Sequence, residues 1–124
     1  QPDQENVSAQ MRDTWEAFKN FSVEQKNEAV EMARRALENL DEEIDEAQKE
    51  IDQGWQNLSQ EARLEKQETL SELKDEREEL QAEYQELQAA SANNWEEAKR
   101  RFGSAWQSTQ QAWRDLTAPN PDTE

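Results

Sequence analysis

The fold is decided by residues 30–51, which read VEMARRALENLDEEIDEAQKEI. Seven apolar residues of this stretch recur in alternating steps of three and four residues: Val30, Ala33, Leu37, Leu40, Ile44, Ala47 and Ile51. Two apolar positions in every seven residues form a heptad seam, which is narrower than the face that a helix presents to a globular core. The stretch therefore predicts a helix that packs against one or two helical neighbours.

A second seam begins near Leu64 and continues to Leu116, and a reversal of the chain is predicted between the two seams, near residues 57–60. Ser59 is a suitable N-cap there, with Glu61 in the first turn behind it. We therefore expect an all-α fold, a long antiparallel helical hairpin with coiled-coil packing. Facing residues have numbers that sum to about 117, so that Leu37 meets Leu80 and Met11 meets Trp106.

Both arms of the hairpin change heptad phase at the same level, near residues 22 and 94. Ser22 and Asn94 also resemble helix starts, because Gln25 and Glu97 follow them at the spacing of a capping box. Two arrangements remain open. Either the arms are continuous, or the terminal helices fold back to give a bundle of three or four helices. We favour the continuous arms because the paired register extends past the phase change.

The chain is interpreted as a single helical domain at residues 7–117 between two polar tails at residues 1–6 and 118–124. The tails hold all three prolines of the sequence. Because proline ends helices and chain ends order poorly, we expect both tails to be disordered.

Composition excludes most chemistry. The 124 residues include 30 Asp and Glu, 14 Lys and Arg, and no His or Cys. The commonest general base and the usual zinc, haem and iron–sulfur ligands are therefore missing, and we expect neither an enzyme nor a cofactor or metal site. A net charge of −16 would repel nucleic acid. The acid-rich segment at residues 38–52 is interpreted as a solvated helix face, with a divalent-cation surface as the alternative.

Aromatic residues gather at the open end of the hairpin in this register. They are interpreted as an interior plug that closes the helical assembly, or alternatively as a surface for a partner helix or an apolar ligand. The residues proposed for that surface are Trp15, Phe18, Trp95, Phe102, Trp106 and Trp113.

Trp113 and Leu116 lie beyond any residue that the first arm offers in the paired register. Unpaired apolar ends of this kind predict self-association, as a homodimer, or a terminal fold-back. The partner of the chain is therefore expected to be a second copy or another helical protein.

The second arm resembles a loose family of small bacterial coiled-coil proteins. The resemblance covers residues 63–116 and rests on Ala90-Ser-Ala-Asn-Asn-Trp95-Glu-Glu-Ala-Lys99, followed by the pairs Ala105-Trp106 and Ala112-Trp113. It implies a small exported helical protein of the bacterial envelope and carries over no site residues. The secreted hairpins with a Trp-x-Gly turn are a more distant likeness, since the turn here reads Gly54-Trp55-Gln56. The spectrin-like three-helix repeat is another, although its helices would be unequal here.

No apolar run of 18 residues is present, so no membrane-spanning helix is expected. The chain begins at Gln1, which is typical of a processed mature protein or of a shortened one. We expect a periplasmic or secreted, non-catalytic structural or protein-interaction protein. The alternative is a carrier or sensor that binds an apolar ligand or a divalent cation through the Trp-rich end or the acidic helix faces.

Overall fold

The computed structural model describes the backbone of residues 2–117 and the side chains of Val7 and of residues 9–117. Over this range the chain forms four α helices and no strand: α1 (Pro2–Phe18), α2 (Lys26–Gly54), α3 (Gln60–Ala89) and α4 (Trp95–Thr117). Two short 3-10 turns, η1 (Val23–Gln25) and η2 (Trp55–Asn57), flank α2. The predicted all-α class is confirmed.

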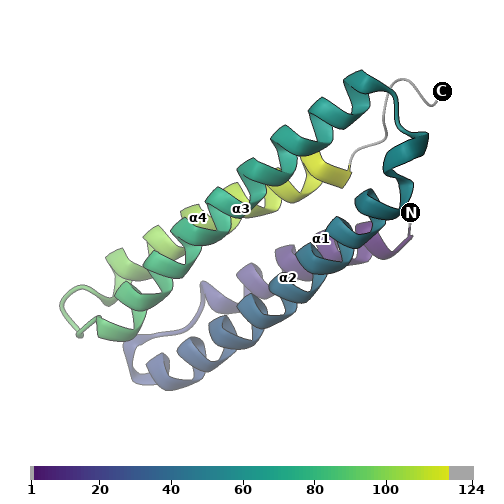
Figure 1. Cartoon of the computed structure of the whole chain (residues 1–124). Helices are drawn as coiled ribbons and strands as arrows, with labels where there is room; N and C mark the ends of the chain where they lie inside the picture. Colours follow the sequence, from purple (N-terminus) through teal and green to yellow (C-terminus); the bar gives the residue numbers. More distant parts are fainter. Residues whose placement is uncertain (1, 118–124) are drawn as a thin grey trace.

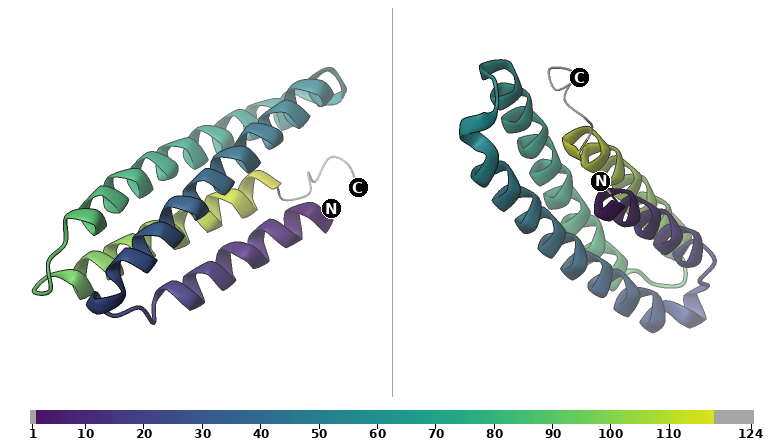
Figure 2. Two further views of the ribbon diagram at one scale, coloured as in Figure 1. Left: turned by 90° about the horizontal axis from the view of Figure 1, so that it is seen from below. Right: turned by 90° about the vertical axis from the view of Figure 1, so that its right-hand side faces the viewer.

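The helices form an antiparallel bundle in which α1 folds back beside α2 and α4 folds back beside α3 (Figures 1 and 2). The chain thus adopts the second of the two arrangements, and the continuous arms that we favoured are not found. At Ser22 and Ala90 the backbone is extended, with ψ of 174° and 142°, which interrupts the helical hydrogen bonds at both predicted breaks. The inner helices α2 and α3 keep the predicted hairpin.

Helix α1 begins at Pro2, so it includes most of the segment that was predicted as a disordered tail at residues 1–6. That prediction overlooked the position of the proline. Proline is favoured at the first residue of a helix, because its missing N–H has no intrahelical partner there and its φ is already helical. The other predicted tail, residues 118–124, lies outside the described residues.

The paired register survives the fold-back because the two arms bend at the same level. Trp106 Nε1 donates to the carbonyl of Met11 at 2.8 Å, which confirms one of the predicted pairs. Between α2 and α3, the guanidinium of Arg77 meets both carboxylate oxygens of Asp41, at 2.7 and 2.9 Å. In both pairs the residue numbers sum to within one of 117.

The three predicted helix starts lie where helices begin. Ser59 Oγ accepts from the Ala62 N–H at 3.1 Å, as an N-cap does, and the side chain of Gln25 accepts from the Ser22 N–H at 3.0 Å. Helix α4 begins directly after Asn94, but the Asn94 side chain accepts from the N–H of Ser91, at 2.7 Å. Asn94 therefore closes the loop that precedes α4.

Helices α3 and α4 are the most closely packed pair in the bundle. Thr109 Oγ1 lies 3.4 Å from the Glu76 carbonyl, so a short side chain of α4 reaches the backbone of α3. Buried alanines, Ala105 and Ala112, flank Thr109 by about one helical turn on either side. Small residues at a helix contact allow the two axes to approach closely.

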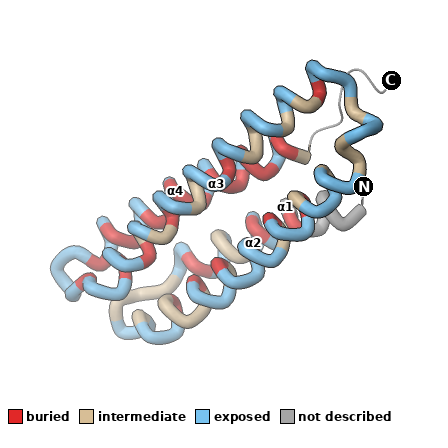
Figure 3. Tube along the Cα trace, in the orientation of Figure 1, coloured by how far each residue is buried: buried red, intermediate tan, exposed pale blue. Residues whose placement is uncertain are grey.

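The core runs along the inward faces of all four helices, and the outward faces are exposed (Figure 3). Trp113 and Leu116, the apolar ends that lacked a partner in the hairpin, are each only 2% exposed. At this end the α2–α3 hairpin projects beyond α4, whose Leu116 carbonyl accepts from Lys66 Nζ at 2.6 Å (Figure 1). Arg63 clamps the reversal, since its Nε donates to the Trp55 carbonyl and its guanidinium lies over the Trp55 ring.

Candidate functional site

The six aromatic residues predicted as a partner or ligand surface lie on α1 and α4, and five of them are buried in the core. Their exposed fractions are 1% for Phe18 and Trp95 and 2% for Phe102, Trp106 and Trp113. Trp15 is half-buried. In the folded chain, only Trp15 among these residues presents substantial side-chain surface to a partner.

Four of these rings form a continuous row between α1 and α4. The centroids of Trp15 and Phe18 are 5.8 Å apart, those of Phe18 and Phe102 are 4.9 Å apart, and those of Phe102 and Trp106 are 6.1 Å apart. These spacings are typical of packed aromatic pairs. Trp15 lies against Gly103, where a Cβ atom would come within 2.1 Å of its ring. The absence of a side chain at Gly103 therefore makes room for the indole.

Hydrogen bonds connect the loop between α1 and α2 to the loop between α3 and α4. The carbonyl of Phe21 accepts from Trp95 Nε1 at 3.2 Å and from Lys99 Nζ at 2.9 Å. Lys26 Nζ donates to the carbonyl of Ala90 at 2.5 Å. Among the described buried side-chain polar atoms, only Trp113 Nε1 lacks a hydrogen-bond partner. The loop contacts hold the fold-back in place.

A groove runs along the seam between α1 and α2, and sequence reasoning missed it. Its larger part is a hollow of about 560 Å³, and a small dimple of about 40 Å³ lies beside it. The two parts share Thr14 of α1 and Ala36 and Asn39 of α2. We call the whole feature the α1–α2 groove. Its other lining residues are Phe21, Asn27, Glu28, Glu31, Met32 and Arg35 in the hollow, and Val7, Gln10, Met11, Leu40, Glu43 and Trp106 in the dimple.

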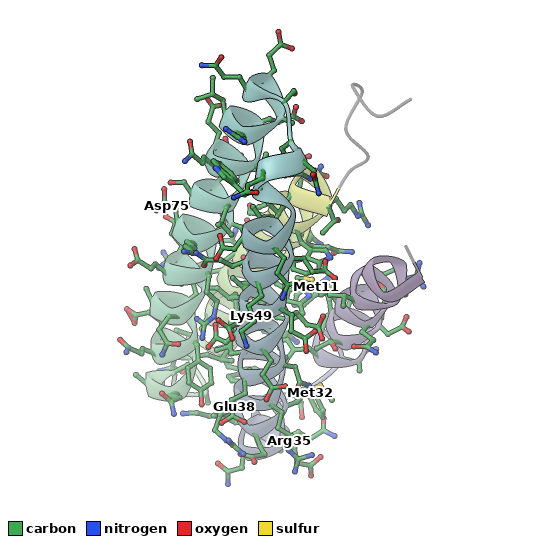
Figure 4. All side chains as sticks on the ribbon, turned by 45° about the vertical axis from the view of Figure 1, so that its right-hand side comes forward. Met11, Met32, Arg35, Glu38, Lys49 and Asp75 are labelled. Carbon is green, nitrogen blue, oxygen red and sulfur yellow. The ribbon has the colours of Figure 1, made fainter. Side chains whose placement is uncertain are left out.

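The apolar floor of the hollow is formed by Phe21, Met32 and Ala36, all of them half-buried. The sequence contains only two methionines, and both line the α1–α2 groove. Figure 4 shows Met11 of α1 and Met32 of α2 between these two helices, whereas Asp75 lies on the other side of the bundle. Met11 is 4% exposed and lines the dimple, whereas Met32 lines the hollow.

A signal for this groove was present in the sequence. Ala29, Met32 and Ala36 form a second apolar stripe on α2, beside the heptad seam of Ala33, Leu37 and Leu40. An apolar stripe wider than two positions in seven predicts more than one helical neighbour.

Charged side chains border the α1–α2 groove. Arg34 Nε donates a hydrogen bond to the Glu31 carboxylate at 3.0 Å, and Arg35 Nε lies 3.6 Å from the same carboxylate. The hydrogen bonds from Arg34 lower the pKa of the Glu31 carboxyl. The pKa of Arg34 is raised, chiefly by its hydrogen bond with Glu31. Both groups are therefore charged at neutral pH.

A second, smaller hollow of about 180 Å³ lies at the other end of the bundle, where α4 ends between α2 and α3. Its lining includes the apolar residues Ile51, Leu58 and Leu116 and the charged residues Glu50 and Lys66. Burial lowers the pKa of Lys66, whose amine is held at the Leu116 carbonyl. A cation at this position also stabilises the C-terminal end of α4 through the helix dipole.

The acidic helix faces form no cluster suited to a metal. Within the described part of the chain, no group of three or more Asp and Glu residues is placed to hold an ion. None of the four described helices carries an apolar stretch of the length that crossing a bilayer requires.

Comparison of the chain with protein-family models, curated proteins and solved structures found no match.

Proposed function

We propose that this chain is a non-catalytic protein-interaction protein of the bacterial cell envelope, and that it binds a helical segment of another protein in the α1–α2 groove. The observation that supports binding is the floor of Phe21, Met32 and Ala36, an elongated apolar strip that α1 and α2 leave partly uncovered. Amphipathic helices bind in such grooves through their apolar face. The envelope location is supported by the sequence resemblance of residues 63–116 alone.

Another helical protein is a better candidate partner than a second copy of the chain. Self-association was inferred from Trp113 and Leu116, and both are covered within the bundle. Two copies would also each bring a net charge of −16 to the interface. Like charges of that size oppose association at moderate salt.

Selection from a displayed library of amphipathic helical peptides of about 18 residues tests this function, since such peptides span about 27 Å. We expect binders whose affinity falls at least about tenfold when Met32→Glu places a charge in the floor. Leu64→Glu is the matched control, because Leu64 is an exposed apolar residue of α3, 55% exposed. Failure to select any binder, or binders indifferent to Met32→Glu, would refute the proposal.

A second candidate function is that of a carrier for a small apolar molecule, and the bundle-end hollow of about 180 Å³ supports it. A ligand there would contact Ile51 and Leu58. Titration with indole, followed by the methyl NMR signals of these two residues, tests this function. Saturable shifts confined to this hollow are expected. Linear shifts spread over the whole protein would exclude it.

A further inference from the structure

We infer that the α1–α2 groove selects an amphipathic helix whose flanks carry Lys and Arg. This inference rests on the proposed function and adds the chemistry of the partner.

The length of the groove matches a helix of four to five turns. On α2 its lining extends from Asn27 to Glu43, and at 1.5 Å per residue this span is about 24 Å. On α1 the lining is formed by Val7, Gln10, Met11 and Thr14, and it continues to Phe21 in the loop. A helix lying in the groove would run parallel to its two walls.

The floor suits an apolar helix face and tolerates variation in it. Phe21 and Met32 present large apolar side chains and Ala36 a small one, so the floor offers apolar surface to the residues that a partner helix places on one face at spacings of three and four. Methionine is unbranched and polarisable, and surfaces rich in it adapt to different apolar side chains. Met11, which lines the adjoining dimple, gives it the same adaptability.

The rim of the groove is acidic overall. Glu28, Glu31 and Glu43 carry three negative charges, and Arg35 is the one basic residue in the lining of these two hollows. Glu31 is already paired inside the chain, with Arg34 Nε at 3.0 Å and Arg35 Nε at 3.6 Å, so Glu28 is the rim carboxylate most open to a partner. Lys or Arg on the flanks of a partner helix would meet this rim favourably, whereas Asp or Glu would be repelled.

The field of the whole molecule acts in the same direction. A net charge of −16 attracts a basic partner over long distances and repels an acidic one, including a second copy of this chain. The exposed face of α2 beyond the groove adds Glu42 and Glu46 to this field. Association with a basic helix should therefore be fast and should weaken as salt screens the charges.

Three synthetic peptides test the inference: an amphipathic helix with Leu on one face and Lys on the flanks, its Glu-for-Lys analogue, and a scrambled Lys peptide without an apolar face. Binding is followed by the ¹³C methyl signals of Met32 and Met11. We expect the Lys peptide to shift Met32 more than Met11, and to bind at least about tenfold more tightly than the other two peptides at low salt.

The variant Glu28→Lys changes an exposed rim residue and leaves the floor intact. It should weaken binding of the Lys peptide and strengthen binding of the Glu peptide. The control Lys49→Glu alters an exposed residue of α2 outside the groove and should not weaken binding of the Lys peptide. Circular dichroism melts of each variant check that the bundle is intact.

Equal binding of the Lys and Glu peptides at Met32 would overturn this inference while leaving the proposed function standing. A change of the Met32 signal with protein concentration, in the absence of any peptide, would show that a second copy of the chain occupies the groove and would overturn the inference. A Met32 shift caused by a free fatty acid but by no peptide would assign the groove to an apolar ligand instead. If no peptide of any charge shifts Met32, both this inference and the proposed function fail.

Discussion

At the scale of single residues, the packing of α1 against α4 depends on Gly103. A glycine within a helix costs about 1 kcal/mol relative to alanine, so helix propensity alone would favour a side chain there. Trp15 reverses that preference, because its ring occupies the space that a Cβ would need, at 2.1 Å. The half-buried indole is thus positioned by the smallest residue of α4.

We predict that Gly103→Ala destabilises the protein by about 1–2 kcal/mol, since the steric cost of overpacking exceeds the gain in helix propensity. The matched control is Gly54→Ala. A Cβ at Gly54 would have no neighbour within 4 Å, so this change should be neutral or stabilising. Urea denaturation followed by Trp fluorescence measures both variants. Equal stability changes at the two positions would show that Trp15 does not pack against Gly103.

Glu76 gives a prediction on pH dependence. Burial raises the pKa of its carboxyl, and so do the charges of Glu79, Asp75 and Glu72. The folded state therefore binds this proton more tightly than the unfolded state does. It follows that the contribution of Glu76 to stability becomes less favourable as pH rises above the ordinary value of 4.5.

Removing this charge should stabilise the bundle at neutral pH. We expect Glu76→Gln to raise the free energy of unfolding by a few tenths of a kcal/mol, as relief of like-charge pairs on a helix does, and to lose this advantage below the ordinary carboxyl pKa. Glu86→Gln, an exposed change on the same helix, is the control. A gain for Glu76→Gln that persists in acid would contradict the electrostatic explanation.

At the scale of helices and loops, the two breaks act as one unit. Lys26 and Lys99 each donate to a backbone carbonyl of the opposite loop, at Ala90 and Phe21 respectively. A charged donor satisfies each carbonyl where the helical ladder has ended. Lys26 occupies a position of the heptad seam, and a lysine in an apolar seam could have indicated that the helix begins there.

We predict that Lys26→Met destabilises the fold by about 1–2 kcal/mol, because the carbonyl of the buried Ala90 loses a charge-assisted hydrogen bond. Lys49→Met on the same helix removes only an exposed ion pair with Asp45 and should cost less than about 0.5 kcal/mol. Urea denaturation of both variants provides the comparison. Similar losses for the two lysines would mean that the loop contact contributes nothing.

The sequence predicts the helices better than it predicts how they fold back. Ser22, Ser59 and Asn94 indicate where helices begin, because capping depends on local residue types. The register that pairs Met11 with Trp106 is satisfied by continuous arms and by folded arms alike, so it could not distinguish them. The deciding contacts, Thr109 to Glu76 and Lys66 to Leu116, join α4 to α3, and only the folded-back arrangement brings these residues together.

The groove could be predicted only in part, for a similar reason. The second stripe of Ala29, Met32 and Ala36 indicates another neighbour for α2 but not whether that neighbour covers it fully. How much of Met32 remains accessible depends on the packing of α1, which lies beside α2 only after the fold-back. The aromatic residues drew attention first because their type is distinctive, yet burial is what large aromatic residues most often achieve in a core.

At the scale of the whole molecule, charge opposes the fold. Like-charged residues four apart, such as Glu42 and Glu46 or Asp75 and Glu79, repel one another along the outer faces of α2 and α3. The exposed ion pairs within helices, such as Arg101 with Glu97 at 3.0 Å, compensate only a small part of this repulsion.

Raising NaCl from about 0.02 M to about 0.5 M should therefore increase the melting temperature, because screening weakens the repulsion at these ionic strengths. Circular dichroism melts measure the effect. The double variant Glu46→Gln with Glu79→Gln should respond less to salt than the unmodified chain. A melting temperature that is independent of salt would contradict this view of the acidic faces.

Helix α1 folds back beside α2 and thereby forms the groove, and one distance between the two helices tests this arrangement. The sequence has no Cys, so Asp13→Cys with Glu38→Cys gives two unique spin-labelling sites, one on each helix. With neighbouring helix axes about 8–10 Å apart, we expect a label separation below about 25 Å by pulsed electron paramagnetic resonance. A distribution centred near 38 Å, about the length of 25 residues in one continuous helix, would contradict the account.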